Sequence, residues 1–376
     1  MMLMCSSVDM RGQLRNSTKE MFRDTLDHAF DLSRFLIEAK GFITVPFIIT
    51  EPALGGFGGG AALVFLTKRK PLIDTLNGKI KVTPLPPDIT GVGGFYSANN
   101  SWAGIAFRSG MWRKPRIKYR IVAGYADLNL SLYRTDDAGE EHRFKFNFET
   151  IPLSGYAMKQ FRGTFWTAGI QYLMLRTEVG IDGENIPEFV QEKEIKSIVS
   201  MPGVLVEYDN RDNIFTPDKG LRFHASLGLS DKAAGSDYNY QNLNVFLYGY
   251  HPFSKNVIGG LRYEMQQVFN DAPFYLLPYI DIRGIPVARY QGNIFSVVET
   301  EWRWDVVPRW SIVGFVGSGK AYDQWNAFSE ADWHTSGGAG FRYLVARLFK
   351  LRMGIDVARG PEQWAYYIVF GSSWLK

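Results

Sequence analysis

Polar and apolar residues alternate along most of this chain. Between 291 and 305, Glu299, Glu301 and Arg303 stand at odd positions, and Trp302 and Trp304 stand at even positions. The same period of two recurs at 143–149, 261–266 and 349–357. A period of two is typical of β-strands. These stretches run for about 10–16 residues, which is long enough for a tilted strand to cross a bilayer. The pattern therefore favours an all-β, transmembrane barrel over a soluble sandwich.

The alternating segments number about sixteen, an even count as single-chain bacterial barrels have. We therefore expect an antiparallel barrel over residues 42–376, preceded by a separate segment over 1–41. Short turns at 113–115, 306–308 and 346–347 are expected on the periplasmic side, and longer connections at 136–141, 179–194 and 322–333 outside the cell. The Lys- and Pro-rich stretch 67–87 breaks this rule. A slip of the alternation near Ala126 predicts a β-bulge.

Residues 16–40 have a helical period instead. Ser17 and Glu20 form a capping-box pattern, and Phe22, Leu26 and Phe30 recur every four residues. A short amphipathic helix is therefore expected, either lying on an apolar surface or acting as a plug or periplasmic latch.

Composition supports this interpretation. Aromatic residues make up 15% of the chain and there are 38 Gly, which suits pleated sheets and tight turns. A net charge of +4 is too balanced to indicate nucleic acid as a partner. Cys5 is the single cysteine, so no disulfide framework is expected. The first fourteen residues show no apolar core of a secretory signal, which indicates a misplaced start, an already trimmed form or a protein that is not exported.

Two stretches imitate nucleotide-binding motifs. Residues 314–320 match most of a phosphate-binding loop, but Ala321 stands where a Ser or Thr would hold Mg²⁺. Residues 56–61 imitate a dinucleotide fingerprint, but a strand pattern follows where a helix should begin. The five His are scattered, and the neighbouring Glu299 and Glu301 fit the lining of a barrel better than acid–base chemistry. We expect no catalytic residue, metal or cofactor, and no enzyme activity.

Residues 274–303 resemble the loop after the eleventh strand of BamA/TamA-type outer-membrane assembly barrels. The chain reads Arg283-Gly284-Ile285 where that family has R-G followed by an aromatic residue. The resemblance implies that the loop folds into the barrel and that Arg283 pairs with acidic residues on the inner wall. Glu301 is the expected partner, with Glu299 and Arg303 beside it. Gly317 stands where the family often has an Asp that pairs with this Arg, so the pairing must fall to Glu301 or the contact must differ.

Further stretches carry the same resemblance. Asp209, Arg211 and Asp212 match a motif that joins the eighth and ninth strands. Residues 338–343 resemble the fourteenth strand. The closing strand, with Tyr366, Ile368, Phe370 and Trp374, resembles the last strand, whose terminal aromatic residue serves as the assembly signal.

The resemblance implies an outer-membrane protein that assists insertion or export of a protein or lipid substrate, through weakened pairing of its first and last strands. Outer-membrane lipids, unfolded or exported proteins and periplasmic partners are the expected contacts. The segment before residue 42 is too short for one of the periplasmic (POTRA) domains of that family, so this member is expected to lack them. A plugged or gated channel and a membrane anchor for a partner complex remain as alternatives.

Overall fold

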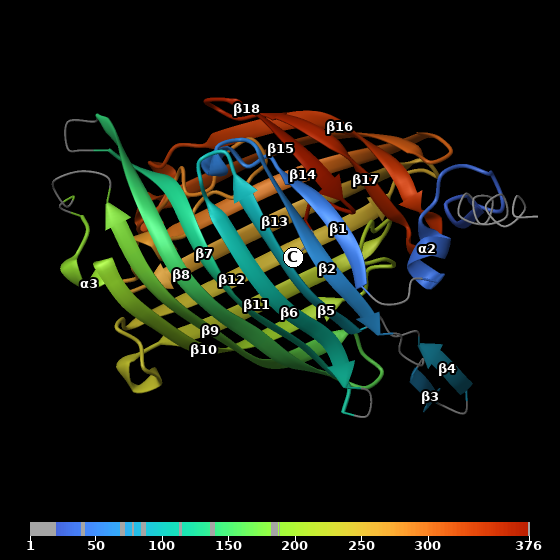
Figure 1. Ribbon diagram of the computed structural model, residues 1–376, viewed down its shortest axis with the longest axis horizontal. Helices are drawn as coiled ribbons and strands as arrows, with labels where there is room; N and C mark the ends of the chain where they lie inside the picture. Colours follow the sequence, from blue (N-terminus) through green and yellow to red (C-terminus); the bar gives the residue numbers. More distant parts are fainter. Residues whose placement is uncertain are drawn as a thin grey trace, which may run out of the picture.

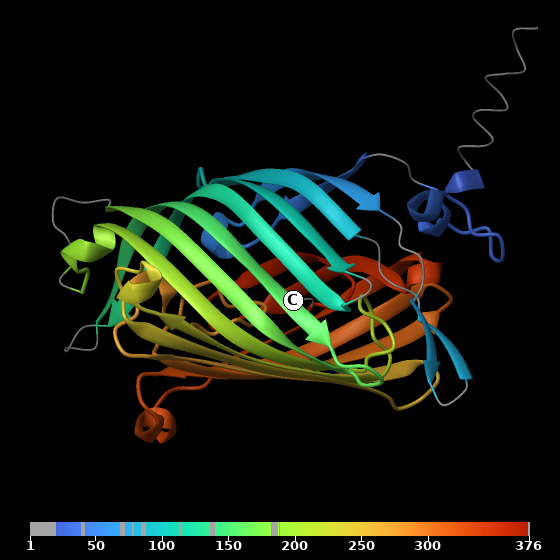
Figure 2. The ribbon, with the colours of Figure 1, turned by 90° about the horizontal axis from the view of Figure 1, so that it is seen from below.

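Sixteen antiparallel strands form one continuous sheet that curves into a barrel (Figures 1 and 2). The computed structural model describes residues 20–38, 42–67, 72–76, 79–83, 88–112, 115–135, 140–181, 187 and 189–374. The barrel strands are β1 (Phe42–Ile49), β2 (Gly58–Thr67), β5 (Asp88–Ser97), β6 (Trp102–Trp112), β7 (Ile117–Thr135), β8 (Glu141–Gln160), β9 (Trp166–Ile181), β10 (Lys196–Asp209), β11 (Gly220–Ser230), β12 (Tyr240–Pro252), β13 (Val257–Phe269), β14 (Ile294–Val307), β15 (Trp310–Tyr322), β16 (His334–Ala346), β17 (Leu351–Arg359) and β18 (Trp364–Phe370). The predicted all-β fold and its strand number are confirmed.

The remaining elements are short. The helices and 3₁₀ turns are α2 (Ser33–Glu38), η1 (Pro52–Leu54), α3 (Glu192–Ile195), η2 (Lys232–Ala234), η3 (Phe274–Leu276), η4 (Trp325–Ser329) and η5 (Arg347–Phe349). Within 67–87, the hairpin of β3 (Leu72–Leu76) and β4 (Lys79–Thr83) forms a separate two-stranded sheet. None of the helices in the described part of the chain is long and apolar enough to cross a membrane. We call the end of the barrel where α2 lies the α2 rim, and the opposite end the loop rim.

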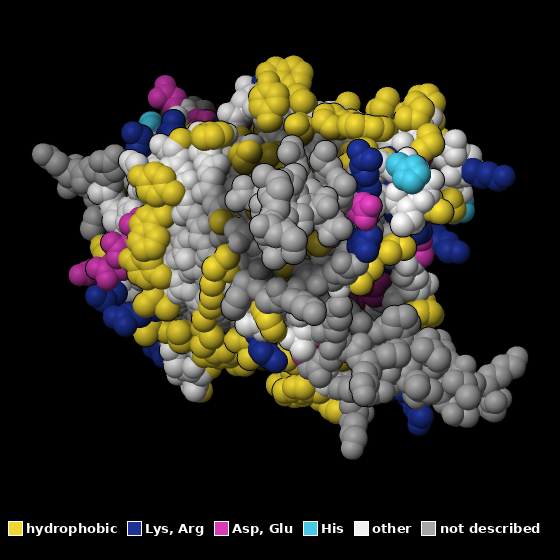
Figure 3. All heavy atoms as spheres, turned by 45° about the vertical axis from the view of Figure 1, so that its right-hand side comes forward, with side chains coloured by type: hydrophobic (Ala, Val, Ile, Leu, Met, Phe, Trp, Pro, Cys, Tyr) yellow, Lys and Arg dark blue, Asp and Glu magenta, His cyan; other side chains and the backbone are white. Residues whose placement is uncertain are grey.

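The alternation predicted for most strands separates the two faces of the wall. In β14, Glu299 and Arg303 are buried inside, whereas Val298, Trp302 and Trp304 are exposed on the outside. Hydrophobic side chains form patches on the surface at the left and along the top of Figure 3. An apolar outer band flanked by aromatic residues is what a barrel surrounded by lipid requires.

Strand β8 departs from the expected pattern. Phe146 and Phe148, expected on the lipid side, are buried against Phe274 and Val190 of two loops, while Arg143 and Lys145 are exposed. Strands β7 and β8 are the longest of the barrel, at 19 and 20 residues. Their extra length at the loop rim provides an apolar face on which the loops pack. The alternation in the sequence cannot distinguish such a face from one that contacts lipid.

The β-bulge expected near Ala126 is absent from the pairing of β7 with its described neighbours. Ala123 pairs with Leu153 and Ala126 with Thr150, so the register is the same on both sides. The alternation slips because Leu128 and Leu130 turn their apolar side chains toward the same loop cluster.

A short N-terminal helix is present at α2, but the helical pattern predicted over 16–40 is interrupted where the structure describes it. Glu20 and Met21 are helical, residues 25–27 form a turn, and helix resumes only at α2. The Asp24 carboxylate accepts from the Leu26 backbone N–H, and His28 has φ +56°. Such side-chain bonds to the backbone compete with helix. Residues 16–19 and 39–40 lie outside the described residues.

The first and last strands meet without a ladder. β1 and β18 lie side by side, with Cα atoms within 8 Å at their closest. Within the residues that the structure describes, however, no hydrogen-bonded pairing joins them. They are also the shortest strands of the barrel, at eight and seven residues. We call this junction the seam.

Candidate functional site in the barrel interior

The segment between β13 and β14, the eleventh and twelfth barrel strands, enters the interior. Its Ile280, Ile282 and Ile285 are buried against Phe295 and Val297 of β14. Apolar contacts of this kind hold a loop in place without regular secondary structure. We call residues 270–293 the inner loop.

Gly284 allows the inner loop to turn at the wall. Its φ is +94°, a conformation that favours glycine. A Cβ here would lie 2.5 Å from Ser336 Oγ and 3.0 Å from Gly360 N, so the close approach also excludes a side chain. The Gly284 N–H donates to the hydroxyl of Tyr367, a residue of β18, at 2.8 Å.

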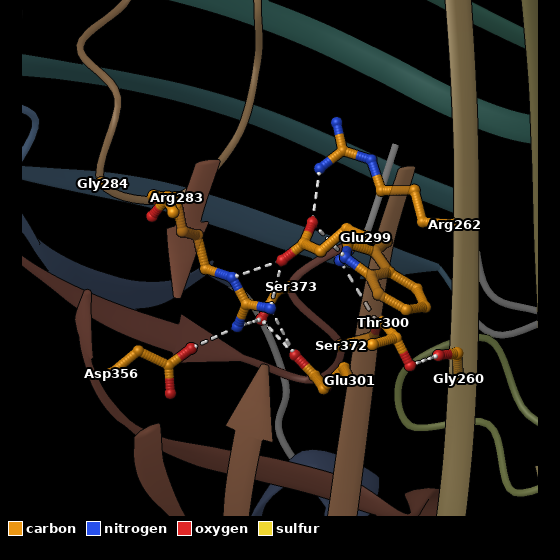
Figure 4. Close-up of polar contacts among 12 residues, drawn as sticks. Gly260, Arg262, Arg283, Gly284, Glu299, Thr300, Glu301, Asp356, Ser372 and Ser373 are labelled. Carbon is orange, nitrogen blue, oxygen red and sulfur yellow. Dashed lines mark hydrogen bonds and ion pairs between the residues drawn. The ribbon is translucent and has the colours of Figure 1, made fainter. Parts of the chain in front are cut away.

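Arg283 is the centre of a buried charge cluster (Figure 4). Its guanidinium donates to Glu299 Oε1 from Nε at 3.0 Å and contacts Glu301 Oε2 at 2.8 Å and Asp356 Oδ2 at 2.7 Å. Its Cζ also lies 3.5 Å from the ring centroid of Phe315. The expected contact with Glu301 is therefore present, but Glu299 and Asp356 share the cation with it.

Glu299 is fully buried and joins two arginines. Oε1 accepts from Arg283, and Oε2 accepts from Arg262 Nη1 at 2.9 Å. Trp374 donates its Nε1 hydrogen to the same Oε2 at 3.0 Å. A buried carboxylate is stable only when charges and hydrogen bonds compensate its desolvation, and here both oxygens are used.

Asp356 is the partner that sequence reasoning missed. It is fully buried on β17, and its Oδ2 accepts from Arg342 Nη2 at 2.9 Å as well as from Arg283. The alternation of β17 had placed Asp356 on the polar face, so its inward direction was predictable. Its meeting with Arg283 depends on the loop, which brings together residues 73 positions apart.

The missing acid at Gly317 has a steric explanation. A Cβ at Gly317 would lie 3.0 Å from two side-chain carbons of Glu299 and 3.2 Å from Ile282. Glu299 and the inner loop therefore fill the space that a longer side chain would need, and Glu299 also supplies the negative charge.

The last described residues also turn into the interior. β18 ends at Phe370, and Gly371 has φ +77°. Ser373 Oγ accepts from Arg283 Nη1 at 2.8 Å, and Trp374, only 2% exposed, packs near Tyr248 and Tyr250. The resemblance had placed Trp374 as the aromatic end of the last strand. In the structure Phe370 is the exposed aromatic residue that ends the strand.

The inner loop also touches both sides of the seam at the loop rim. The Val287 N–H donates to Glu51, beside the β1–β2 turn, at 3.2 Å. Arg289 pairs with Glu362, in the turn between β17 and β18, at 2.8 Å. The inner loop thus bridges the first and last strands where no ladder does.

Other predicted residues lie outside the cluster. Arg303 pairs with Asp218 and Asp305, not with Arg283 or its partners. Arg211 makes two hydrogen bonds to Asp209, at 2.9 and 2.8 Å, and Asp212 accepts from Lys350. Tyr366, Ile368 and Phe370 alternate along β18, with Tyr366 and Phe370 exposed on the outer face.

The charges of the cluster are arranged so that they can hold the inner loop in place. Three guanidinium groups, of Arg262, Arg283 and Arg342, face the carboxylates of Glu299, Glu301 and Asp356. Among the residues that the structure describes, no group of three or more His, Cys, Asp or Glu is placed to hold a metal ion. Removing one partner would leave an uncompensated buried charge, so the cluster fixes the loop in one position.

The sequence matches no known family profile and no curated protein. Its fold, in contrast, matches solved structures. A structure of BamA from Haemophilus ducreyi lacking POTRA domains 1–3 aligns with a TM-score of 0.58 at 13% identity, over 94% of this chain and 81% of that one. CdiB from Escherichia coli aligns with a TM-score of 0.58 at 11% identity, over 87% of this chain and 62% of that one. CdiB from Acinetobacter baumannii aligns with a TM-score of 0.55 at 9% identity, over 88% and 59%.

The chain thus spans about three fifths of the length of the two CdiB proteins. At these identities the likeness concerns the fold. The sixteen-stranded barrel of this chain therefore has the same fold as these BamA and CdiB structures.

Proposed function

We propose that this protein is an outer-membrane barrel that assists the insertion or export of a protein or lipid substrate by opening at the seam between β1 and β18. The observation that carries the proposal is the missing ladder between these two strands. Every other pair of neighbouring barrel strands is joined by backbone pairing, so separation at the seam breaks the fewest backbone hydrogen bonds.

The composition of the seam supports opening there. Thr44, Val45 and Pro46 are all exposed although they are consecutive, so both faces of β1 are uncovered at this point. Pro46 has no N–H to donate, and proline within sheets is confined mainly to edge strands. On the neighbouring β2, Gly58, Gly59 and Gly60 pair with β1 and bring no side chains to fix its register.

The inner loop supports a reversible closure. Its contacts with Glu51 and Glu362 cross the seam through side chains, and side-chain contacts of this kind can form and break without unfolding a strand. The barrel fold of BamA and CdiB is compatible with the proposal. The exposed apolar band would then contact outer-membrane lipids.

A plugged channel is the second candidate, because the inner loop and Trp374 fill part of the interior. Conductance in planar bilayers separates the two. A channel would show steady ion currents that increase when Trp374 is replaced by Ala. A barrel that works at its seam would show small or rare currents in both forms.

The proposed function is tested by depletion. The protein would be depleted from its native cells, and the outer-membrane proteins and lipids would be quantified over time. We expect loss of a defined subset of membrane or exported components, restored by the wild-type protein and not by a variant with Arg283 replaced by Ala. An unchanged envelope after full depletion would contradict the proposal.

A further inference from the structure

The segment before β1 is clamped to the α2 rim through one arginine. Arg309, in the turn between β14 and β15, contacts three carboxylates of this segment. Its Nε lies 2.5 Å from Asp27 Oδ2, its Nη1 lies 2.8 Å from Asp31 Oδ2, and its Nη2 bonds Asp24. The Arg309 side chain is only 4% exposed.

The guanidinium depends on the segment for nearly all of its partners. Besides the three carboxylates, Arg309 Nη1 donates to the Phe30 carbonyl at 3.1 Å. Among the hydrogen-bond partners of this guanidinium in the described residues, only the Leu344 carbonyl, also at 3.1 Å, belongs to the barrel. If the segment left, the guanidinium would lose the three carboxylates and the Phe30 carbonyl and would bind water instead. Several convergent contacts of this kind distinguish the clamp from a single surface ion pair.

A second set of bonds extends the clamp to the neighbouring turn between β16 and β17. Arg347 pairs with Asp24 at 2.8 Å, and its backbone N–H donates to Asp31 at 3.0 Å. The Leu348 N–H donates to Ser33 Oγ at 3.1 Å, and the Leu32 N–H donates to the Val345 carbonyl at 2.6 Å. The helix α2 thus lies against the end of β16 and against η5 (Figure 1).

The segment before β1 is bound close to the seam. In the sheet, β16 is followed by β17 and β18, and the next strand around the barrel is β1. Residues 24–33 are bound to the turns before β17, and β1 begins at Phe42, shortly after α2 ends at Glu38. The segment is therefore bound on one side of the seam, and β1 follows it in sequence on the other side.

We propose that residues 20–38 are a strap that closes the seam at the α2 rim, and that Arg309 is the residue that fastens it. The strap complements the inner loop, which bridges the same two edges at the loop rim through Glu51 and Glu362. Release of the carboxylates from Arg309 frees the start of β1 to move away from β18. This inference extends the proposed function, but its test measures the seam and not the activity.

The backbone of Arg309 offers a clean substitution. Its φ is +72°, in the left-handed region that Asn tolerates better than most residues. Arg309→Asn therefore removes the guanidinium with little change in backbone strain. Lys350 is a matched control, since it is a cation at φ +52° in the adjacent turn. Its partners are Asp212 and Asp218, at 2.8 and 2.7 Å, and not the strap.

The test is hydrogen–deuterium exchange with mass spectrometry on the full chain in lipid nanodiscs. For Arg309→Asn we expect the amides of residues 20–38 and of β1 to exchange roughly tenfold faster or more, because the free energy of local opening is lower. Exchange in β7 and β8, far from the seam, should stay unchanged. The Lys350→Asn protein should exchange like the wild type in both the strap and β1.

Two results would overturn the proposal. Faster exchange in residues 20–38 with unchanged β1 would show that the segment docks without holding the seam. Unchanged exchange in residues 20–38 would show that Arg309 does not fasten it. If Arg309→Asn fails to fold, judged by heat-modifiable migration on gels, Asp27→Asn gives the same readout with a milder change, because it removes one carboxylate that is partly exposed.

Discussion

Trp374 and Glu299 are joined by a hydrogen bond of 3.0 Å inside the barrel, although they lie on β18's trailing segment and on β14. Trp374 thereby connects the strand at the seam to the cluster that holds the inner loop. A Cβ at Gly260 would lie 2.9 Å from the Trp374 ring, so β13 leaves space for the indole. The interior is thus shaped around this side chain.

Replacing Trp374 should destabilise the barrel. Removing a buried Trp side chain typically costs about 3–5 kcal/mol, and here it also removes a hydrogen bond to Glu299. We expect Trp374→Ala to lower the free energy of unfolding by this order, measured by urea unfolding in lipid vesicles. Trp364→Ala removes an indole at the opposite end of β18, where the side chain is 60% exposed, and it should cost much less. Equal losses would contradict the buried position of Trp374.

Arg283 and Glu299 should be energetically coupled. Each single replacement by Ala is expected to cost about 3–5 kcal/mol, because the other charge stays buried and uncompensated. The double variant should lose less than the sum of the two by about 0.5–3 kcal/mol. The same cycle with Glu301 should give a smaller coupling, because its side chain is 15% exposed whereas that of Glu299 is fully buried. Additive losses in the Glu299 cycle would rule out the pair.

The outer wall should tolerate charge according to depth. Ile355 is exposed on the outer face of β17, and near the bilayer midplane its replacement by Arg should lower the folding stability of the protein by about 2–4 kcal/mol. Leu348 is exposed in η5 at the α2 rim, and its replacement by Arg should lower the folding stability by no more than about 0–1 kcal/mol. Folding titrations into vesicles give both values. Similar values at the two sites would argue against a lipid-facing wall.

The strap should loosen in strong acid. The hydrogen bond from Arg309 lowers the pKa of Asp27 from 3.8 to about 2. Burial raises the pKa of Asp31, but hydrogen bonds from Ser33 and Arg309 outweigh it and the net pKa is lowered. A carboxyl with a lowered pKa stabilises the docked strap above its ordinary pKa of 3.8, and this contribution is lost as pH falls toward about 2.

Pepsin, which is active throughout this acid range, measures the release. Cleavage within residues 20–38 should be slow at the upper end of the window and faster at its lower end. With Arg309→Asn, cleavage should be fast at both ends. A wild-type rate with no dependence on pH across the window would contradict the role of these carboxylates.

Strand periodicity was sufficient to predict most of the barrel, because every second residue of a wall between lipid and an interior must change polarity. Glu299, Glu301 and Asp356 could be assigned to the inner face on that ground alone. The resemblance of the loop around Arg283 then indicated this cation as the partner of Glu301, with Glu299 beside it, but gave no partner for Asp356. The choice among the three carboxylates depended on side-chain packing at Gly317, which alternation does not encode.

The strap and Trp374 could not be predicted for a different reason. Asp24, Asp27 and Asp31 are spaced as on a helix, and their pairing with Arg309 joins residues between 278 and 285 positions apart. Tertiary ion pairs of this kind override local helix propensity. Likewise, the inward turn at Gly371 depends on the space beside Gly260, so sequence alone favoured a straight last strand with Trp374 at its end.

Opening of the seam toward a substrate is tested most directly by photo-crosslinking in living cells. A photoreactive amino acid would replace Ile48 of β1 at the seam, or Ile312 of β15 on the outer wall away from it, since the two are matched at 50% and 51% exposure. We predict protein adducts at Ile48, formed while substrates are being made, and few at Ile312. Adducts of equal yield at both positions, or none at Ile48, would contradict a function that works through the seam.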